Sequence, residues 1–87
     1  MTYFVYMITS ISKNKKKTYV GYTNNLFERL KKHNSNKGAR STKGYKWKII
    51  FKKKFYTKSK AMSYEYKLKK DRRKRIEIIE NTKYKLC

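Results

Sequence analysis

The segment from Tyr3 to Thr9 reads YFVYMIT, an unbroken apolar, aromatic and β-branched run in a chain with a formal net charge of +21. A run without polar alternation is typical of a strand that is buried on both faces, so we predict a central strand of a sheet here. No other feature constrains the fold as strongly, because a chain of 87 residues can build only one thin core. We therefore expect residues 1–87 to form a single domain around this strand.

A second strand is predicted at Thr18–Tyr22, which is rich in β-branched and aromatic residues. The polar, lysine-rich segment Ser10–Lys17 separates the two strands, and this arrangement indicates a hairpin with a long loop. Gly21 lies inside the second strand. We expect the backbone to bend there, or to approach a ligand so closely that a Cβ would interfere.

A short helix is predicted from Leu26 to about His33. Asn24 or Asn25 can cap its start, and Glu28, three residues after Asn25, completes the pattern of a capping box. The apolar stripe of this helix is expected to consist of Leu26, Phe27 and Leu30.

Arg29 and His33 are separated by four residues, so they share one face of this helix, which we expect to differ from the apolar stripe. Tyr19, on the preceding strand, could converge with them on one site.

The second half of the chain predicts a loop, a strand and two helices. The loop covers Asn34–Tyr45, and Trp47–Phe55 alternates imperfectly between lysine and apolar residues, as in an edge strand with one solvated face. Thr57 or Ser59 can cap a helix that runs to about Lys70, with Ala61, Tyr64 and Leu68 on its buried face.

A short third helix is predicted after Asp71, its cap, and its apolar residues are Ile76, Ile78 and Ile79. We expect the polar tail from Asn81 to fray. The element order is then β-β-α-β-α-α. It predicts an α+β fold with a small, mainly antiparallel three-stranded sheet, helices packed on it and a basic C-terminal helical segment at 66–87.

Lysine and arginine dominate the charged residues, with 26 of them against 5 Asp and Glu. This excess indicates a polyanionic partner, nucleic acid first and an anionic membrane surface second. No apolar run approaches the ~20 residues of a membrane span, and the N-terminal apolar patch is too short for a signal peptide. We expect an intracellular protein, cytoplasmic or nuclear, that does not act at a membrane. One Cys and one His exclude a zinc finger formed within the chain.

Two tripeptides one hairpin apart, Phe4-Val5-Tyr6 and Tyr19-Val20-Gly21, resemble the two signature tripeptides of the GIY-YIG nuclease superfamily. The resemblance covers about Thr2 to Lys70. Within the superfamily, the pattern is similar to the compact single-domain branch, which is related to the nuclease module of structure-specific endonucleases. The chain has Phe4 where the family name has Gly, but it keeps Tyr6. The similarity continues through Tyr22-Thr23-Asn24, Arg29, His33-Asn34, Lys37-Gly38-Ala39 and Glu65.

The resemblance implies a metal-dependent endonuclease that hydrolyses phosphodiester bonds of DNA by a single-metal mechanism. Arg29 would bind the scissile phosphate and offset charge in the transition state. Tyr19 would act as the general base or orient the water, for which it needs nearby cations at neutral pH. His33 would relay a proton from Tyr19 or bind the phosphate. The implied catalytic residues are Tyr6, Tyr19, Arg29, His33 and Glu65.

A cluster of carboxylates for several metal ions is not expected, because the chain has few acids: Glu28, Glu65, Asp71, Glu77 and Glu80. Glu28 is assigned to a cap, and the last three lie in the basic C-terminal segment. One Mg²⁺ or Mn²⁺ ion, held by Glu65 with water and phosphate oxygens, is the natural alternative. Glu65 could instead form a salt bridge with Lys69, four residues further on.

The basic residues of the loop and of the C-terminal segment are expected to contact the phosphate backbone. These residues are Lys37, Arg40, Lys43, Lys67, Lys69, Lys70, Arg72 and Arg73. Duplex or branched DNA is favoured over RNA as the partner. Two further interpretations stay open: a nucleic-acid-binding module on this fold that has lost catalysis, and a subunit that needs a partner protein for targeting.

Overall fold

The computed structural model describes residues 2–10, 17–35 and 46–86, with the backbone alone for 82–86. The order β-β-α-β-α-α predicted from the sequence is confirmed, and the fold is α+β. Its elements are β1 (Tyr3–Ser10), β2 (Thr18–Thr23), α1 (Leu26–Asn34), β3 (Trp47–Phe55), α2 (Lys58–Lys70) and α3 (Arg72–Leu86).

The three strands form one antiparallel sheet in the order β2-β1-β3. The predicted central position of the first apolar run is confirmed, since β1 pairs with both other strands and its residues from Val5 to Ile8 are fully buried. The predicted edge position of β3 is confirmed as well.

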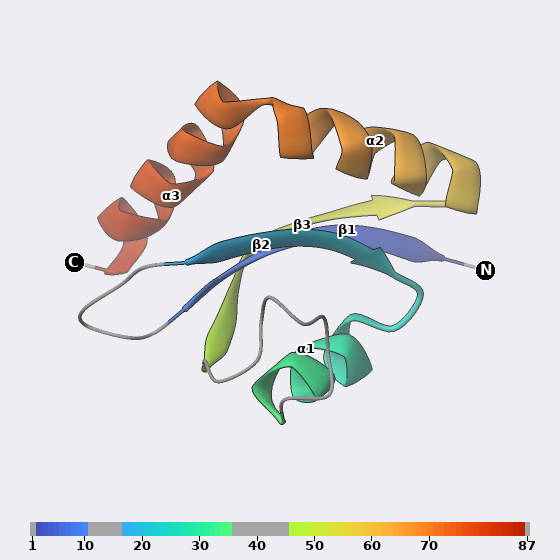
Figure 1. Cartoon of the computed structure of the whole chain (residues 1–87), viewed down its shortest axis with the longest axis horizontal. Helices are drawn as coiled ribbons and strands as arrows, with labels where there is room; N and C mark the ends of the chain where they lie inside the picture. The colour runs from blue at the N-terminus through green and yellow to red at the C-terminus, as the bar shows by residue number, and fades with distance from the viewer. Residues whose placement is uncertain (1, 11–16, 36–45, 87) are drawn as a thin grey trace.

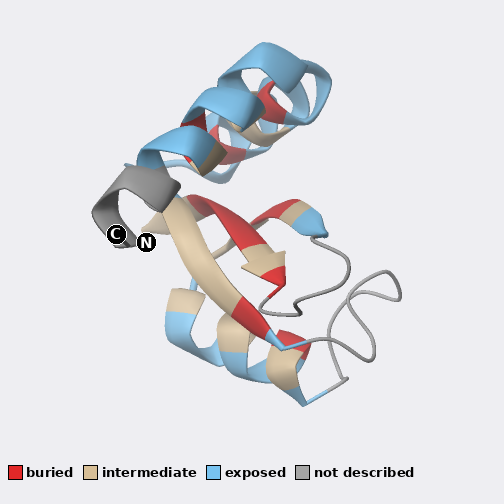
Figure 2. Ribbon diagram, turned by 90° about the vertical axis from the view of Figure 1, so that its left-hand side faces the viewer, coloured by how far each residue is buried: buried red, intermediate tan, exposed pale blue. Residues whose placement is uncertain are grey.

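Helices cover both faces of the sheet, α1 on one face and α2 with α3 on the other (Figure 1). Successive side chains of a strand point to opposite faces, so β1 supplies both layers. Val5 and Met7 pack in the layer of α2 and α3. Tyr6 and Ile8 pack in the layer of α1, together with Trp47. Figure 2 shows the buried residues gathered between the helices, whose outer sides are exposed.

A β-bulge in β3 explains its imperfect alternation. Met7 pairs with Phe51 and Ile8 pairs with Ile49, so Ile50 is the extra residue. An extra residue changes which face the following side chains take. Ile49 accordingly packs in the layer of α1, whereas Ile50 and Phe51 pack in the layer of α2 and α3.

Side-chain caps begin the helices where the sequence indicates. Asn25 Oδ1 accepts from the backbone N–H of Glu28 at 3.1 Å, so the cap of α1 is Asn25 and not Asn24. Thr57, not Ser59, caps α2. The predicted cap of α3 is confirmed, since Asp71 Oδ1 accepts from the N–H of Lys74 at 3.0 Å.

Three expectations about the helices are wrong. Phe27 is 83% exposed, and Arg29 and His33 lie on the sheet-facing side of α1 with Leu26 and Leu30. The prediction of the apolar stripe was wrong because the inner face of the helix includes a buried histidine, His33, where an aliphatic residue would be expected. Of the apolar residues expected in α3, Ile78 and Ile79 do contact the core, whereas Ile76 is 43% exposed. The tail does not leave the helix at Asn81, because α3 continues to Leu86.

The predicted loop Asn34–Tyr45 overlaps α1 by one residue, Asn34, and its residues 36–45 lie outside the described part of the chain. Within the described residues, no helix combines the length and the apolar character needed to cross a membrane.

Candidate active site

The phenol of Tyr6 forms the centre of a polar cluster between the sheet and α1. Tyr6 pairs with Gly21 across β1 and β2, and its side chain is 1% exposed. A Cβ on Gly21 would lie 2.6 Å from Tyr6 Oη, closer than real Cβ contacts allow. The close approach expected at this glycine is therefore made by the Tyr6 ring.

Two side chains of α1 bind the Tyr6 hydroxyl. His33 Nε2 lies 2.8 Å from Tyr6 Oη, and Arg29 Nε–H donates to the same oxygen at 3.3 Å. The spacing of four residues places Arg29 and His33 one turn apart, so both reach the same point of the sheet. His33 has no solvent exposure, unlike the half-buried Arg29.

Tyr19 completes the aromatic side of the cluster. It lies two residues before Gly21 on β2, so it faces the same layer. Its ring centroid is 5.0 Å from that of His33 and 6.3 Å from that of Tyr6. The structure thus brings together four of the five expected catalytic side chains, from β1, β2 and α1, and Tyr19 is the half-buried tyrosine of the two.

The protonation states in this cluster follow from burial and from Arg29. The pKa of Tyr6 is raised to about 12, mainly by burial. The hydrogen bond from Arg29 lowers this pKa, whereas the negative charge of Glu65 raises it further. Burial, followed by the positive charge of Arg29, lowers the pKa of His33. The hydrogen bond with Tyr6 is the main cause that raises the pKa of Arg29, and the Tyr19 hydroxyl acts in the same direction.

At neutral pH, these shifts give a neutral phenol, a neutral imidazole and a charged guanidinium. We assign His33 Nε2 as the acceptor of the Tyr6 hydroxyl hydrogen, since Arg29 already donates to the same oxygen. Tyr6 is then engaged as donor and acceptor at once, and it is not available as a base.

Glu65 comes from α2, in the layer across the sheet from α1 (Figure 1). Its carboxylate forms an ion pair with Lys69 Nζ at 2.9 Å, as the alternative interpretation of the sequence predicts. The Glu65 side chain is 16% exposed, and its charge acts on Tyr6, so it lies within electrostatic range of the cluster.

A divalent cation bound near the Tyr6 cluster would have one protein carboxylate as a ligand, that of Glu65. Among the described residues, no group of three or more His, Cys, Asp or Glu side chains gathers in one place. Mg²⁺ commonly keeps several waters and binds one or two carboxylates together with substrate phosphates. A partly exposed Glu65 fits such an ion, whereas it does not fit an ion that needs a full set of protein ligands.

Asn34 was not singled out as a site residue, yet it fixes the end of the helix that carries His33. Its Oδ1 accepts from the backbone N–H of Trp47 at 2.6 Å, and its Nδ2 donates to the carbonyl of the same residue at 3.2 Å. Both backbone groups of Trp47 thereby bind one side chain. The sequence signal that could have identified Asn34 was its position directly after His33, where the apolar periodicity of the helix ends.

The basic residues expected to bind phosphates fall into two groups. Those of the C-terminal segment are exposed on α2 and α3: Lys67, Lys69, Lys70, Arg72 and Arg73. They lie in the layer opposite α1, where Lys67 and Lys70 line a surface hollow of about 460 Å³ with Tyr66 and Asp71. The others, Lys37, Arg40 and Lys43, lie outside the described residues.

Comparison with known proteins gives a consistent result. A family model described as "GIY-YIG catalytic domain" matches residues 2–83. The UPF0213 protein OB0043 of Oceanobacillus iheyensis is 44% identical over 64 residues, which cover 71% of this chain and 74% of that protein. The UPF0213 protein YazA of Bacillus subtilis is 48% identical over 61 residues, 69% of this chain and 62% of that protein.

A solved structure is similar as well. The solution NMR structure of the UPF0213 protein BH0048 from Bacillus halodurans superposes with a TM-score of 0.53 at 33% sequence identity. The match covers 92% of this chain and 84% of the other.

Proposed function

This chain belongs to the GIY-YIG family, and on that premise we propose that it is a metal-dependent endonuclease that hydrolyses phosphodiester bonds of DNA. One observation carries the proposal. A charged Arg29, a neutral His33 and two tyrosines meet at one point of the sheet, held by the hydrogen bonds of the Tyr6 hydroxyl. Such a preorganised cationic and phenolic cluster suits a phosphate and its attacking water.

Arg29 would bind the scissile phosphate. Its Nε is used by Tyr6, so the guanidinium is fixed at one edge and can present its remaining N–H groups to phosphate oxygens. A guanidinium held in place needs no rearrangement when charge develops on the phosphate, and such fixed donors are effective in the transition state.

The two tyrosines would have different roles. Tyr6 is buried and has a raised pKa of about 12, which makes it a group that positions Arg29 and His33. Tyr19 is half-buried, and its hydroxyl acts on the charge of Arg29. Unlike Tyr6, it is partly open to solvent and lies beside His33, so we assign Tyr19 as the base or as the group that orients the water.

Glu65 would hold one Mg²⁺ or Mn²⁺ ion, with water and phosphate oxygens as the other ligands. When bound, such an ion would offset negative charge on the phosphate and on the leaving oxygen. Lys69 already neutralises the carboxylate at 2.9 Å, and its own side chain is about half exposed. It can therefore swing away into solvent when a cation or a phosphate arrives.

The exposed lysines and arginines of α2 and α3 would contact the phosphates of the DNA backbone. Binding through these contacts would not depend on the base sequence. The second candidate function, a binding module without catalysis, draws on the same surface. It is less well supported, because binding alone does not require the buried Tyr6, His33 and Arg29 network.

The experiment is a cleavage panel of linear, flapped, branched and single-stranded DNA, each incubated with Mg²⁺, with Mn²⁺ or with EDTA. We expect metal-dependent cuts in at least one substrate and none in EDTA. Binding of every substrate without any cut, in either metal, would favour the binding module. Gel filtration with and without DNA separates an independent nuclease from a subunit that needs a partner.

A further inference from the structure

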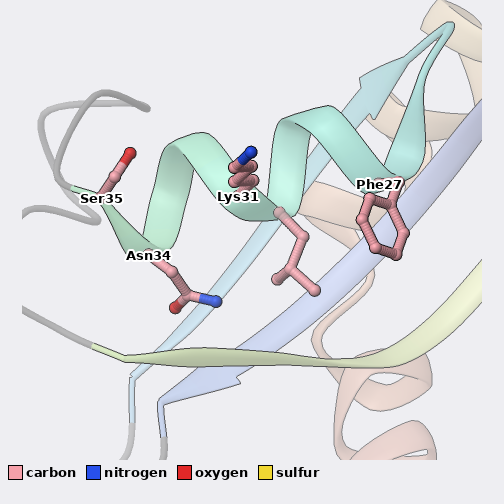
Figure 3. A pocket seen from close by; sticks show the side chains of 5 residues that line it. Phe27, Lys31, Asn34 and Ser35 are labelled. Carbon is pink, nitrogen blue, oxygen red and sulfur yellow. The ribbon is translucent and has the colours of Figure 1, made fainter.

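A groove runs along α1, at the side of the helix where Asn34 is bound to Trp47 at the start of β3. It has a volume of about 390 Å³ and is lined by Phe27, Leu30, Lys31, Asn34 and Ser35. Figure 3 shows Phe27 at one end of the groove and Asn34 and Ser35 at the other, with β3 below them. Its volume falls in the ~300–1,000 Å³ range of small-ligand sites, and neither Tyr6 nor Arg29 lines it.

Phe27 is the unusual residue of this groove. At 83%, it is the most exposed large hydrophobic side chain among the described residues. A phenyl ring with this exposure contributes little to the stability of the fold, and it leaves apolar surface in water. The aliphatic Leu30, one turn of helix away, continues the apolar surface into the groove. The groove thus offers an exposed aromatic ring next to one aliphatic side chain.

The surroundings of the groove are cationic. Lys31, one helical turn after Phe27, lines it, and Lys32 is exposed beside it on α1. Lys46 and Lys48 flank Trp47, the residue to which Asn34 is bound. No acidic side chain lines the groove, so its charge is complementary to an anion.

An aromatic face beside lysines is the combination by which proteins bind unpaired nucleotides, the base stacking on the ring while the cations contact the phosphates. We propose that this groove binds one unpaired nucleotide of the DNA substrate, with its base stacked on Phe27 and its phosphate near Lys31. This inference rests on the proposed function, because it takes the substrate to be DNA.

The position of the groove relative to Arg29 indicates which nucleotide would bind. Phe27 and Arg29 are two residues apart on α1, so they point to nearly opposite flanks of the helix. A helix with its side chains is about 10–12 Å wide. At ~3.4 Å per nucleotide along a stacked strand that passes around the helix, the bound base lies at least about three nucleotides from the scissile phosphate. A substrate with a gap, flap or overhang near the cut supplies such a base, whereas an intact duplex does not.

The test compares the affinity for two DNAs of the same sequence, one a perfect duplex and one with a short single-stranded gap, by fluorescence anisotropy in EDTA. The variants are Phe27→Ala, Phe27→Leu, which keeps an apolar side chain but cannot stack, and Phe27→Trp. Tyr56→Ala is the matched control, because Tyr56 is another exposed aromatic, at 74%, outside the groove. Circular dichroism establishes that each variant is folded.

We expect Phe27→Ala and Phe27→Leu to weaken binding to gapped DNA by roughly 5- to 150-fold, the range of one base–aromatic stacking contact, with little change for the duplex. Phe27→Trp should bind gapped DNA at least as tightly as wild type. A base analogue whose fluorescence is quenched by stacking, placed at each gap position in turn, should respond at one position only.

Three results would overturn the proposal: equal affinity of wild type for both DNAs, full affinity of Phe27→Leu for gapped DNA, or an equal loss in Tyr56→Ala. The second result would indicate an apolar contact, as with a protein partner. The outcome is separate from that of the proposed function, because binding is measured without metal. Phe27-dependent binding with no cleavage would contradict the nuclease alone, and cleavage without a Phe27 effect would contradict the groove alone.

Discussion

The Tyr6 hydroxyl lies 2.8 Å from Nε2 of His33, and both side chains are shielded from solvent. The two residues are 27 positions apart in sequence and come from the central strand and from the helix that covers it. A buried hydrogen bond of this kind fixes the orientation of both rings, because turning either ring away would leave a buried polar group without a partner, at the free-energy cost of its desolvation. It also fixes Arg29, which donates to the same oxygen.

The stability of the fold should depend on the protonation of His33. Burial and the charge of Arg29 lower the pKa of His33 in the folded state. Above the unfolded pKa of about 6.5, the imidazole is neutral in both states and its contribution is complete. Below that pH the unfolded state takes up the proton first, so the free energy of unfolding should fall as the pH falls from about 6.5 towards the lowered pKa.

Urea unfolding between pH 7.5 and pH 5 measures this dependence. The chain has a single histidine, so a slope in this range is attributable to His33. The control is His33→Gln, which cannot titrate and should lose the slope whatever its overall stability. A wild-type free energy of unfolding that stays constant over the range would contradict the lowered pKa.

Gly21→Ala should damage the site through Tyr6. The new Cβ would lie 2.6 Å from Tyr6 Oη and 3.0 Å from Tyr19 Cε1, and the Tyr6 ring is held by two hydrogen bonds. We expect a loss of about 1–3 kcal/mol in the free energy of unfolding, as for overpacked cores, together with a loss of cleavage.

Val20→Ala is the matched control for this change. Val20 is the neighbour of Gly21 on β2 and is buried in the layer of α2 and α3. Removing its methyl groups should cost about 2 kcal/mol and leave the Tyr6 cluster in place. Denaturant unfolding and cleavage rates of both variants are compared. Equal losses of cleavage in the two variants would mean that stability, and not the position of Tyr6, limits activity.

Arg29→Lys keeps the positive charge and loses the planar fork, which donates to Tyr6 and which we propose binds a phosphate at the same time. We expect the cleavage rate to fall by roughly 100-fold or more, while duplex binding changes little, because one phosphate contact among many is altered. Arg72→Lys makes the same exchange on the exposed surface of α3 and should cleave like wild type. A parallel loss of binding and cleavage in Arg29→Lys would assign Arg29 to binding alone.

Binding to duplex DNA should weaken steeply with salt. The lysines and arginines of α2 and α3 would neutralise phosphates, and each one neutralised adds about −0.9 to the slope of log K against log salt concentration. Titrations at several salt concentrations in EDTA give this slope. A slope near zero, or a strong preference for one sequence, would contradict a surface that contacts the backbone.

The sequence predicted the elements of the fold well, because period, caps and turn residues are local signals. Asn25, Thr57 and Asp71 each cap a helix by a bond to a residue three positions away, and all three were among the caps that the sequence offered, although Asn24 and Ser59 stayed open as alternatives. The prediction for the sheet-facing side of α1 was wrong, because that side is determined by a contact between residues far apart in sequence. His33 is buried by its bond to Tyr6, and no local pattern distinguishes such a histidine from a solvated one.

The sequence suggested the convergence of Tyr19, Arg29 and His33, and the resemblance of short motifs supplied the full set of candidate site residues, but neither gave the packing that brings them together. Tyr6, Tyr19, Arg29 and His33 gather through the pairing of β1 with β2 and through the packing of α1 on that pair. The room that Gly21 provides for Tyr6 depends on the strand register, which the sequence leaves open. The exposure of Phe27 follows from the same packing.

The role of Glu65 is the central claim of the nuclease proposal, and its neighbour Lys69 supplies the control. Glu65→Gln keeps the size of the side chain and removes the charge that a hard cation needs. Lys69→Gln breaks the same ion pair from the other side and leaves the carboxylate intact. If Glu65 served only as the partner of Lys69, the two variants would behave alike.

The decisive measurement is the cleavage rate as a function of Mg²⁺ concentration for wild type, Glu65→Gln and Lys69→Gln, with DNA binding measured in EDTA. We predict that Glu65→Gln binds DNA at least as well as wild type, because one repulsive carboxylate is gone, and that it loses cleavage, with partial recovery in excess Mg²⁺. Lys69→Gln should retain Mg²⁺-dependent cleavage, although it loses one of the expected phosphate contacts. Cleavage by Glu65→Gln at the wild-type rate, with the same Mg²⁺ midpoint, would contradict the assignment of Glu65 as the metal ligand.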